Sequence, residues 1–82
     1  MVHVTKVQTL PDWRLAVEFS DGVRGEISLK DRLFGPVFEP LRAWAMFGQA
    51  YVDEFGAVAW PNGADLAPDA LYEQIAAGSQ AA

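Results

Sequence analysis

Hydrophobic and polar residues alternate along the first third of the chain in the pattern of antiparallel strands. Valines at positions 2, 4 and 7 mark a first strand, and their uneven spacing predicts a bulge near Lys6. Residues 15–19 alternate between large apolar side chains and polar or small ones, and residues 23–29 repeat this pattern. We therefore predict three consecutive strands, separated by turns at residues 10–13 and 20–22.

The turn between the second and third strands fixes their register. Directly opposed residues lie on the same face of a sheet, so a two-residue turn that set Phe19 opposite Arg24 would mix the core and solvent faces. A three-residue loop with Gly22 in the left-handed conformation instead pairs Phe19 with Val23. The same register places Glu18 opposite Arg24, so we predict a three-residue loop.

The middle of the chain predicts a short helix followed by a second hairpin. Pro40 is suited to open a helix, and apolar residues then recur at helical spacing up to Gly48, the predicted C-terminal cap. Residues 50–52 and 58–60 match in character if Gly56 closes the turn between them in the left-handed conformation. This register sets Val52 opposite Val58 and Tyr51 opposite Ala59.

The last segment predicts an amphipathic helix, because Pro68, Leu71, Tyr72 and Ile75 recur at helical spacing. Asp65 is expected to cap this helix, and Gly78 is expected to end it before a flexible C-terminal tail over residues 79–82. We therefore predict one α+β domain over residues 1–78. It is a small antiparallel β-meander in the order β-β-β-α-β-β-α, with the helices packed on one face of the sheet.

Composition and charge restrict the possible functions. The chain has 82 residues, 51% of them hydrophobic, and no cysteine, which leaves no room for a large enzyme and excludes disulfides and thiolate metal sites. No apolar run approaches the ~20 residues of a membrane span, so we expect a cytoplasmic protein. The net charge is −5, and residues 43–82 hold five carboxylates but no Lys or Arg. This distribution favours a partner with a basic surface and disfavours nucleic acid.

Nucleic-acid binding is kept only as a minor alternative, carried by four cations that could share an edge: Arg24, Lys30, Arg32 and Arg42.

Catalytic and metal-binding patterns are missing from the sequence. His3, the single imidazole, is expected to face solvent from the first strand. Asp53 and Glu54 lie in a predicted turn and bring too few oxygens for calcium. No glycine-rich phosphate loop or nucleophile motif is present. We expect no catalytic residues, no cofactor, no metal site and no enzyme activity.

The candidate interaction or ligand surface consists of five residues: Trp13, Tyr51, Trp60, Asn62 and Asp65. Exposed aromatic side chains anchor many protein interfaces, which favours an interaction surface. Alternatively, Trp60, Asn62 and Asp65 could form a site for a small ligand or a reaction, because a polar turn there meets aromatic rings. Among the aromatic residues, Trp44, Trp60 and Tyr72 are expected to be buried.

Much of the chain resembles the bacterial family called domain of unknown function 2442. The resemblance rests on the hairpin of residues 15–27, then on Phe38 to Leu41, and most specifically on the segment from Trp60 to Tyr72. It implies a small α+β fold and defines no catalytic residues. It also implies a short stand-alone protein, often encoded beside another small domain in a suggested toxin–antitoxin arrangement. Some related proteins carry a helix-turn-helix extension, which we do not expect here.

The combined expectation is a non-enzymatic protein-interaction module. Its partner would be a neighbouring small protein with a basic surface, in an antitoxin-like role, or a second copy joined through open strand edges. The alternative is a small-ligand binding or enzymatic domain with its site near Trp60, Asn62 and Asp65.

Overall fold

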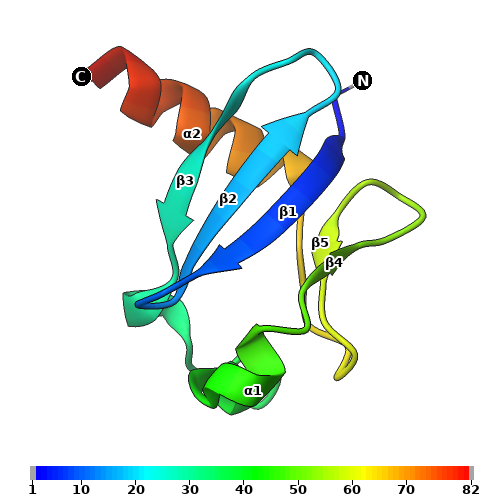
Figure 1. Cartoon of the computed structure of the whole chain (residues 1–82), viewed down its shortest axis with the longest axis vertical. Helices are drawn as coiled ribbons and strands as arrows, with labels where there is room; N and C mark the ends of the chain where they lie inside the picture. The colour runs from blue at the N-terminus through cyan, green and yellow to red at the C-terminus, as the bar shows by residue number, and fades with distance from the viewer. Residues whose placement is uncertain (1, 82) are drawn as a thin grey trace.

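Two small antiparallel sheets and one long helix make up the fold (Figure 1). The computed structural model describes residues 2–81, with side chains described up to Ala76. The first sheet has the order β1-β2-β3, and the second has the order β4-β5-β6. Their bounds are β1 Val4–Leu10, β2 Arg14–Phe19, β3 Arg24–Ser28, β4 Tyr51–Val52, β5 Val58–Ala59 and β6 Asp65–Leu66.

Short helical turns connect the two sheets, and a longer helix follows them. These are the 3-10 helices η1 (Lys30–Arg32) and η2 (Glu39–Arg42), then α1 (Trp44–Phe47) and α2 (Pro68–Ala81). The order is thus three strands, the short helices, three strands and a helix, which confirms the α+β class. None of these helices has the length and apolar character that crossing a bilayer requires.

The prediction of one continuous helix from Pro40 to Gly48 is wrong, because the segment forms two short helices. Ala43 is extended, with φ −77° and ψ 121°, and divides the segment into η2 and α1. Leu41 and Phe47 are both fully buried, although a continuous helix would place residues six apart on different faces. The break lets both side chains reach the core. Gly48 is the C-terminal cap of α1, as predicted, and has the right-handed φ of −65°.

The first sheet confirms the predicted register. Leu15 lies opposite Ile27, Val17 opposite Gly25 and Glu18 opposite Arg24. The Phe19 amide donates a 2.8 Å hydrogen bond to the Val23 carbonyl, and Gly22 has φ +92°. The bulge is also confirmed, because the β1–β2 register shifts between Val4 and Lys6.

The second sheet contains the predicted hairpin and one strand more. Tyr51 lies opposite Ala59, and Gly56 is left-handed with φ +75°, as predicted. β6 pairs with β5, so the strands form two three-stranded sheets rather than one five-stranded meander. Asp65 therefore lies in a strand and does not cap α2, which corrects the sequence prediction.

The end of α2 also differs from the prediction. The helix continues past Gly78 to Ala81. The flexibility assigned to residues 79–82 stays a prediction, because the side chains after Ala76 lie outside the described residues.

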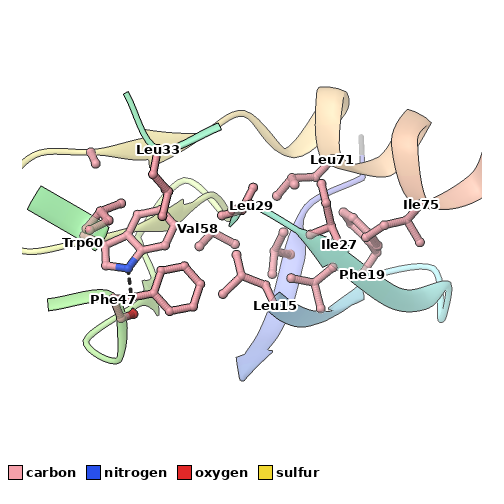
Figure 2. Packing of buried hydrophobic residues seen from close by; sticks show 14 residues of the cluster. Leu15, Phe19, Ile27, Leu29, Leu33, Phe47, Val58, Trp60, Leu71 and Ile75 are labelled. Atoms are coloured by element: carbon pink, nitrogen blue, oxygen red, sulfur yellow. Dashed lines mark hydrogen bonds between the residues drawn. The ribbon is translucent and has the colours of Figure 1, made fainter. Parts of the chain in front are cut away.

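The core runs between the inner face of the first sheet, α2 and the second sheet (Figure 2). Leu71 and Ile75 of α2 are buried at the end of the core next to the first sheet, while Phe47 and Trp60 fill the opposite end. A Cβ atom on Gly25 would lie 2.7 Å from Cγ2 of Ile75, so the bare backbone of β3 lets α2 approach closely. Each fully buried large apolar side chain stabilises such a fold by about 1.5–3 kcal/mol.

Candidate interaction surface

The five residues selected from the sequence do not form one site. Trp60 is only 1% exposed, and its Nε1 donates a 2.9 Å hydrogen bond to the Phe47 carbonyl (Figure 2). The Asn62 side chain is bonded at both ends: Oδ1 accepts from the Ala64 amide at 3.1 Å, and Nδ2 donates to the Val37 carbonyl at 2.9 Å. Trp60 and Asn62 thus stabilise the fold through their polar atoms.

Tyr51 and Asp65 lie on one face of the second sheet. The register places Tyr51, Ala59 and Asp65 in a single cross-strand row, with both outer residues exposed. They flank Ala59, which is itself buried, and therefore do not touch as direct cross-strand neighbours do. This row joins two of the predicted residues, but it leaves Trp60 inside the core.

Trp13 belongs to a different region, beside α1. It lies in the turn after β1 with φ +55°, and its Nε1 donates a 3.1 Å hydrogen bond to the Leu41 carbonyl. Its ring meets Trp44 edge-to-face, with ring centroids 6.3 Å apart. Trp44 was expected to be buried but is 47% exposed, because the break at Ala43 turns it away from the core.

The segment from η1 to α1 presents an apolar surface that the sequence prediction missed. Phe34 is 63% exposed, and Val37 and Trp44 are also exposed; these three residues are called the loop surface below. The available signal was a run of apolar residues around Gly35 that fits neither a helical nor a strand period. The half-buried Trp13 adjoins this surface through its contact with Trp44.

Hydrogen bonds from three side chains, two of them outside the segment, hold its backbone. Arg42 Nε donates to the Leu33 carbonyl at 2.6 Å, Asn62 Nδ2 donates to the Val37 carbonyl at 2.9 Å, and Trp13 binds the Leu41 carbonyl. A backbone fixed at three points loses little further freedom when a partner binds. The exposed apolar side chains are therefore displayed on a preorganised loop.

A second exposed feature is the tip of the β4–β5 hairpin. Asp53 Oδ1 accepts hydrogen bonds from the Phe55 and Ala57 amides, both at 2.9 Å. The Gly56 amide donates to the Asp53 carbonyl at 3.1 Å. Phe55 projects from this turn and is 78% exposed.

Two hollows accompany these surfaces, and neither is lined by Trp60, Asn62 or Asp65. An open groove of about 820 Å³ crosses the outer face of β1–β3 and is bordered by Tyr51. A smaller hollow of about 210 Å³ is lined by Leu29, Arg32, Leu33, Phe38 and Leu66.

The charges of the two halves of the chain are arranged differently. In residues 2–76, both ion pairs lie in the first half: Arg14–Glu26 at 2.8 Å and Lys30–Asp12 at 3.1 Å. The exposed carboxylates Glu54, Asp69 and Glu73 belong to a stretch without Lys or Arg. Negative charge therefore concentrates on the second sheet and α2.

Titratable groups give little sign of catalytic chemistry in the described part of the chain. His3 is exposed as expected, and its amide donates to Ser20 Oγ at 3.2 Å. A hydrogen bond from Tyr72 lowers the pKa of Asp21, and the same bond raises the pKa of Tyr72. No group of three or more potential metal ligands occurs among the described residues.

Comparison with known proteins gives one match. A family model described as a protein of unknown function (DUF2442) matches residues 4–77. No curated protein and no solved structure matches the chain.

Proposed function

The chain belongs to the DUF2442 family, and we propose from the geometry of its surface that it is a protein-interaction module without catalytic activity. The contact region is the loop surface of Phe34, Val37 and Trp44. This proposal also assigns Trp13 a role, as the half-buried aromatic neighbour whose ring meets Trp44 edge-to-face.

The observation that carries the proposal is the exposure of large apolar side chains on a fixed backbone. Phe34 and Trp44 keep about half or more of their surface in water, and leaving such apolar surface in water opposes stability. Two side chains from elsewhere in the molecule, Trp13 and Asn62, and one from within the segment, Arg42, nevertheless hold this backbone in place. Several large exposed apolar side chains in one segment are a common feature of protein interfaces, and tryptophan is prominent among residues that dominate binding energy.

Net charge supports a partner of positive charge. The chain carries −5, and all of the excess carboxylates fall after residue 42. Opposite charge on the partner would accelerate association and make it depend on salt. A small basic protein encoded beside this chain, with this chain acting as its antitoxin-like partner, fits these properties.

The experiment is co-expression with the product of the adjacent gene, followed by size-exclusion chromatography at low salt. We expect co-elution, and we expect it to be lost when Phe34→Ser and Trp44→Ser are combined. Gln8→Ser is the matched control, because Gln8 is exposed on the outer face of β1 and lies in the groove instead. Co-elution that survives the loop double variant contradicts the proposal.

Light scattering tests the other candidate partner, a second copy of this chain. A dimer that dissociates when Phe34 and Trp44 are both replaced would make the loop surface a self-association site. A monomer at high concentration would dismiss the homodimer.

A further inference from the structure

Phe55 has no structural role that explains its position. It is 78% exposed, more than any other large hydrophobic side chain in the described part of the chain. It is also missing from the half-buried hydrophobic residues that pack against the core. Single exposed hydrophobic residues are common on protein surfaces, so exposure alone gives it no function.

The turn that carries Phe55 is fixed by several independent contacts. One carboxylate oxygen of Asp53 accepts two backbone amides, including that of Phe55 itself. The Gly56 carbonyl accepts a 2.8 Å hydrogen bond from the Val4 amide, which ties the turn to β1 of the other sheet. Gly56 also packs directly on the His3 side chain, where a Cβ would collide. The ring is therefore presented in one place by a rigid turn and does not lie on a loose loop.

The charged residues beside Phe55 in the chain have one sign. Glu54 is exposed immediately beside Phe55, and Asp53 adds a second carboxylate at the base of the turn. Residues 50–60 contain no Lys or Arg. An apolar ring beside uncompensated carboxylates is complementary to an apolar pocket whose rim carries cations.

We propose that Glu54 and Phe55 form a docking tip, in which the Phe55 ring enters an apolar pocket on a protein partner and Glu54 meets Lys or Arg at its rim. The tip lies on a different element from the loop surface and forms a second contact. It rests on the proposed function only in that the chain binds a protein. Because the turn is already ordered, binding there requires little further ordering of the backbone.

The test begins with site-specific photocrosslinking in the full-length chain. Phe55 is replaced by p-benzoylphenylalanine, which keeps an aromatic ring at the tip, and Gln8 is replaced in the same way as a control. The adduct formed in the native host is sequenced. We expect a contact peptide rich in apolar residues with Lys or Arg beside them, formed from position 55 and not from position 8.

The captured protein is then purified, and its affinity is measured for four forms of the chain: the wild type, Phe55→Ser, Glu54→Gln and the loop double variant. We expect Phe55→Ser to weaken binding at least tenfold with an unchanged melting temperature, and Glu54→Gln to reduce the salt dependence of binding. No specific adduct, an adduct only with a second copy of this chain, or full affinity of Phe55→Ser each overturns the docking tip. If Phe55→Ser binds normally while Phe34→Ser with Trp44→Ser does not, the proposed function stands without the tip. If neither variant weakens binding, both proposals fail.

Discussion

Tyr72 Oη donates a 2.7 Å hydrogen bond to Asp21 Oδ2, which joins α2 to the turn between β2 and β3. Asp21 also stabilises its own turn, because Oδ1 accepts the Val23 amide at 3.0 Å. The Tyr72 ring meets Phe19 edge-to-face, with centroids 5.1 Å apart. One tyrosine thus links the first hairpin to a helix 51 residues later in the chain.

This link predicts a stability that depends on pH at both extremes. The pKa of Asp21 is lowered in the folded protein, so its contribution is present above the ordinary value of 3.8 and is lost as pH falls through the lowered value. The pKa of Tyr72 is raised, so its contribution is present below 10.0 and is lost as pH rises through the raised value. Tyr72→Phe keeps the ring contact with Phe19. It should remove the Tyr72 contribution and reduce that of Asp21, which keeps the hydrogen bond from the Val23 amide.

The free energy of unfolding of the wild type and of Tyr72→Phe is measured by urea titration, from below the lowered pKa of Asp21 to above the raised pKa of Tyr72. The two proteins should differ most between the two transitions and converge toward each extreme. A difference that is constant over the whole range would assign the effect to packing alone.

Trp60 should be among the residues that the fold tolerates least. Trp60→Ala removes a fully buried side chain and is expected to cost about 3–5 kcal/mol, close to the whole stability of a small domain. Trp60→Phe removes the indole donor from the Phe47 carbonyl, which keeps only the 3.3 Å hydrogen bond from the Ala50 amide. It should cost about 0.5–1.5 kcal/mol for the lost hydrogen bond in addition to the lost packing. Circular dichroism with urea titration would measure both. The control is Trp44→Phe, which should change stability by about 1 kcal/mol or less because Trp44 is exposed.

Gly25 and Ile75 should be energetically coupled. Gly25→Ala places a methyl group against Cγ2 of Ile75 and should destabilise by about 1–3 kcal/mol through overpacking. Ile75→Leu moves the branch away from Cβ and opens that space. The double variant should therefore lose less stability than the two single losses combined, with a coupling of about 0.5–3 kcal/mol in a double-mutant cycle. Simple additivity would show that α2 moves away from β3 instead.

Gly56 and Gly63 allow the cost of backbone strain to be compared with the cost of a steric clash between side chains. Both have positive φ, but the space around Gly63 is open, whereas a Cβ on Gly56 meets His3. Gly63→Ala should cost about 1–2 kcal/mol from backbone strain alone, and Gly56→Ala should cost more. His3→Ala should not rescue Gly56→Ala, because the nearest atom is the Cβ that alanine retains. Equal thermal shifts for the two glycine variants would refute this distinction.

The hairpin registers were predictable because each rests on a local rule. Gly22 and Gly56 are left-handed in three-residue loops, and the matching of faces then leaves one register. β6 was not predictable in this way, since Asp65 and Leu66 alone are too few to show an alternation.

The apolar pattern around Pro40 was misleading for a related reason. Helical spacing groups residues by faces of a continuous helix, but the core requires both Leu41 and Phe47. Tertiary packing therefore overrides the local pattern, breaks the helix at Ala43 and exposes Trp44. Phe34 and Val37 were missed for a different reason, because the apolar run around Gly35 fits neither a helical nor a strand period. Trp60 and Asn62 were selected as candidate surface residues, but their side chains make hydrogen bonds within the fold.

The edge-to-face contact between Trp13 and Trp44 has an optical consequence. Indole emission shifts in wavelength and intensity with the polarity around the ring, and Trp44 is about half exposed at the loop surface while Trp60 is fully enclosed. A Trp44→Phe variant would isolate the change from the remaining rings. The chain therefore carries its own fluorophore at the place where contact is expected, and a titration can follow complex formation without any attached dye.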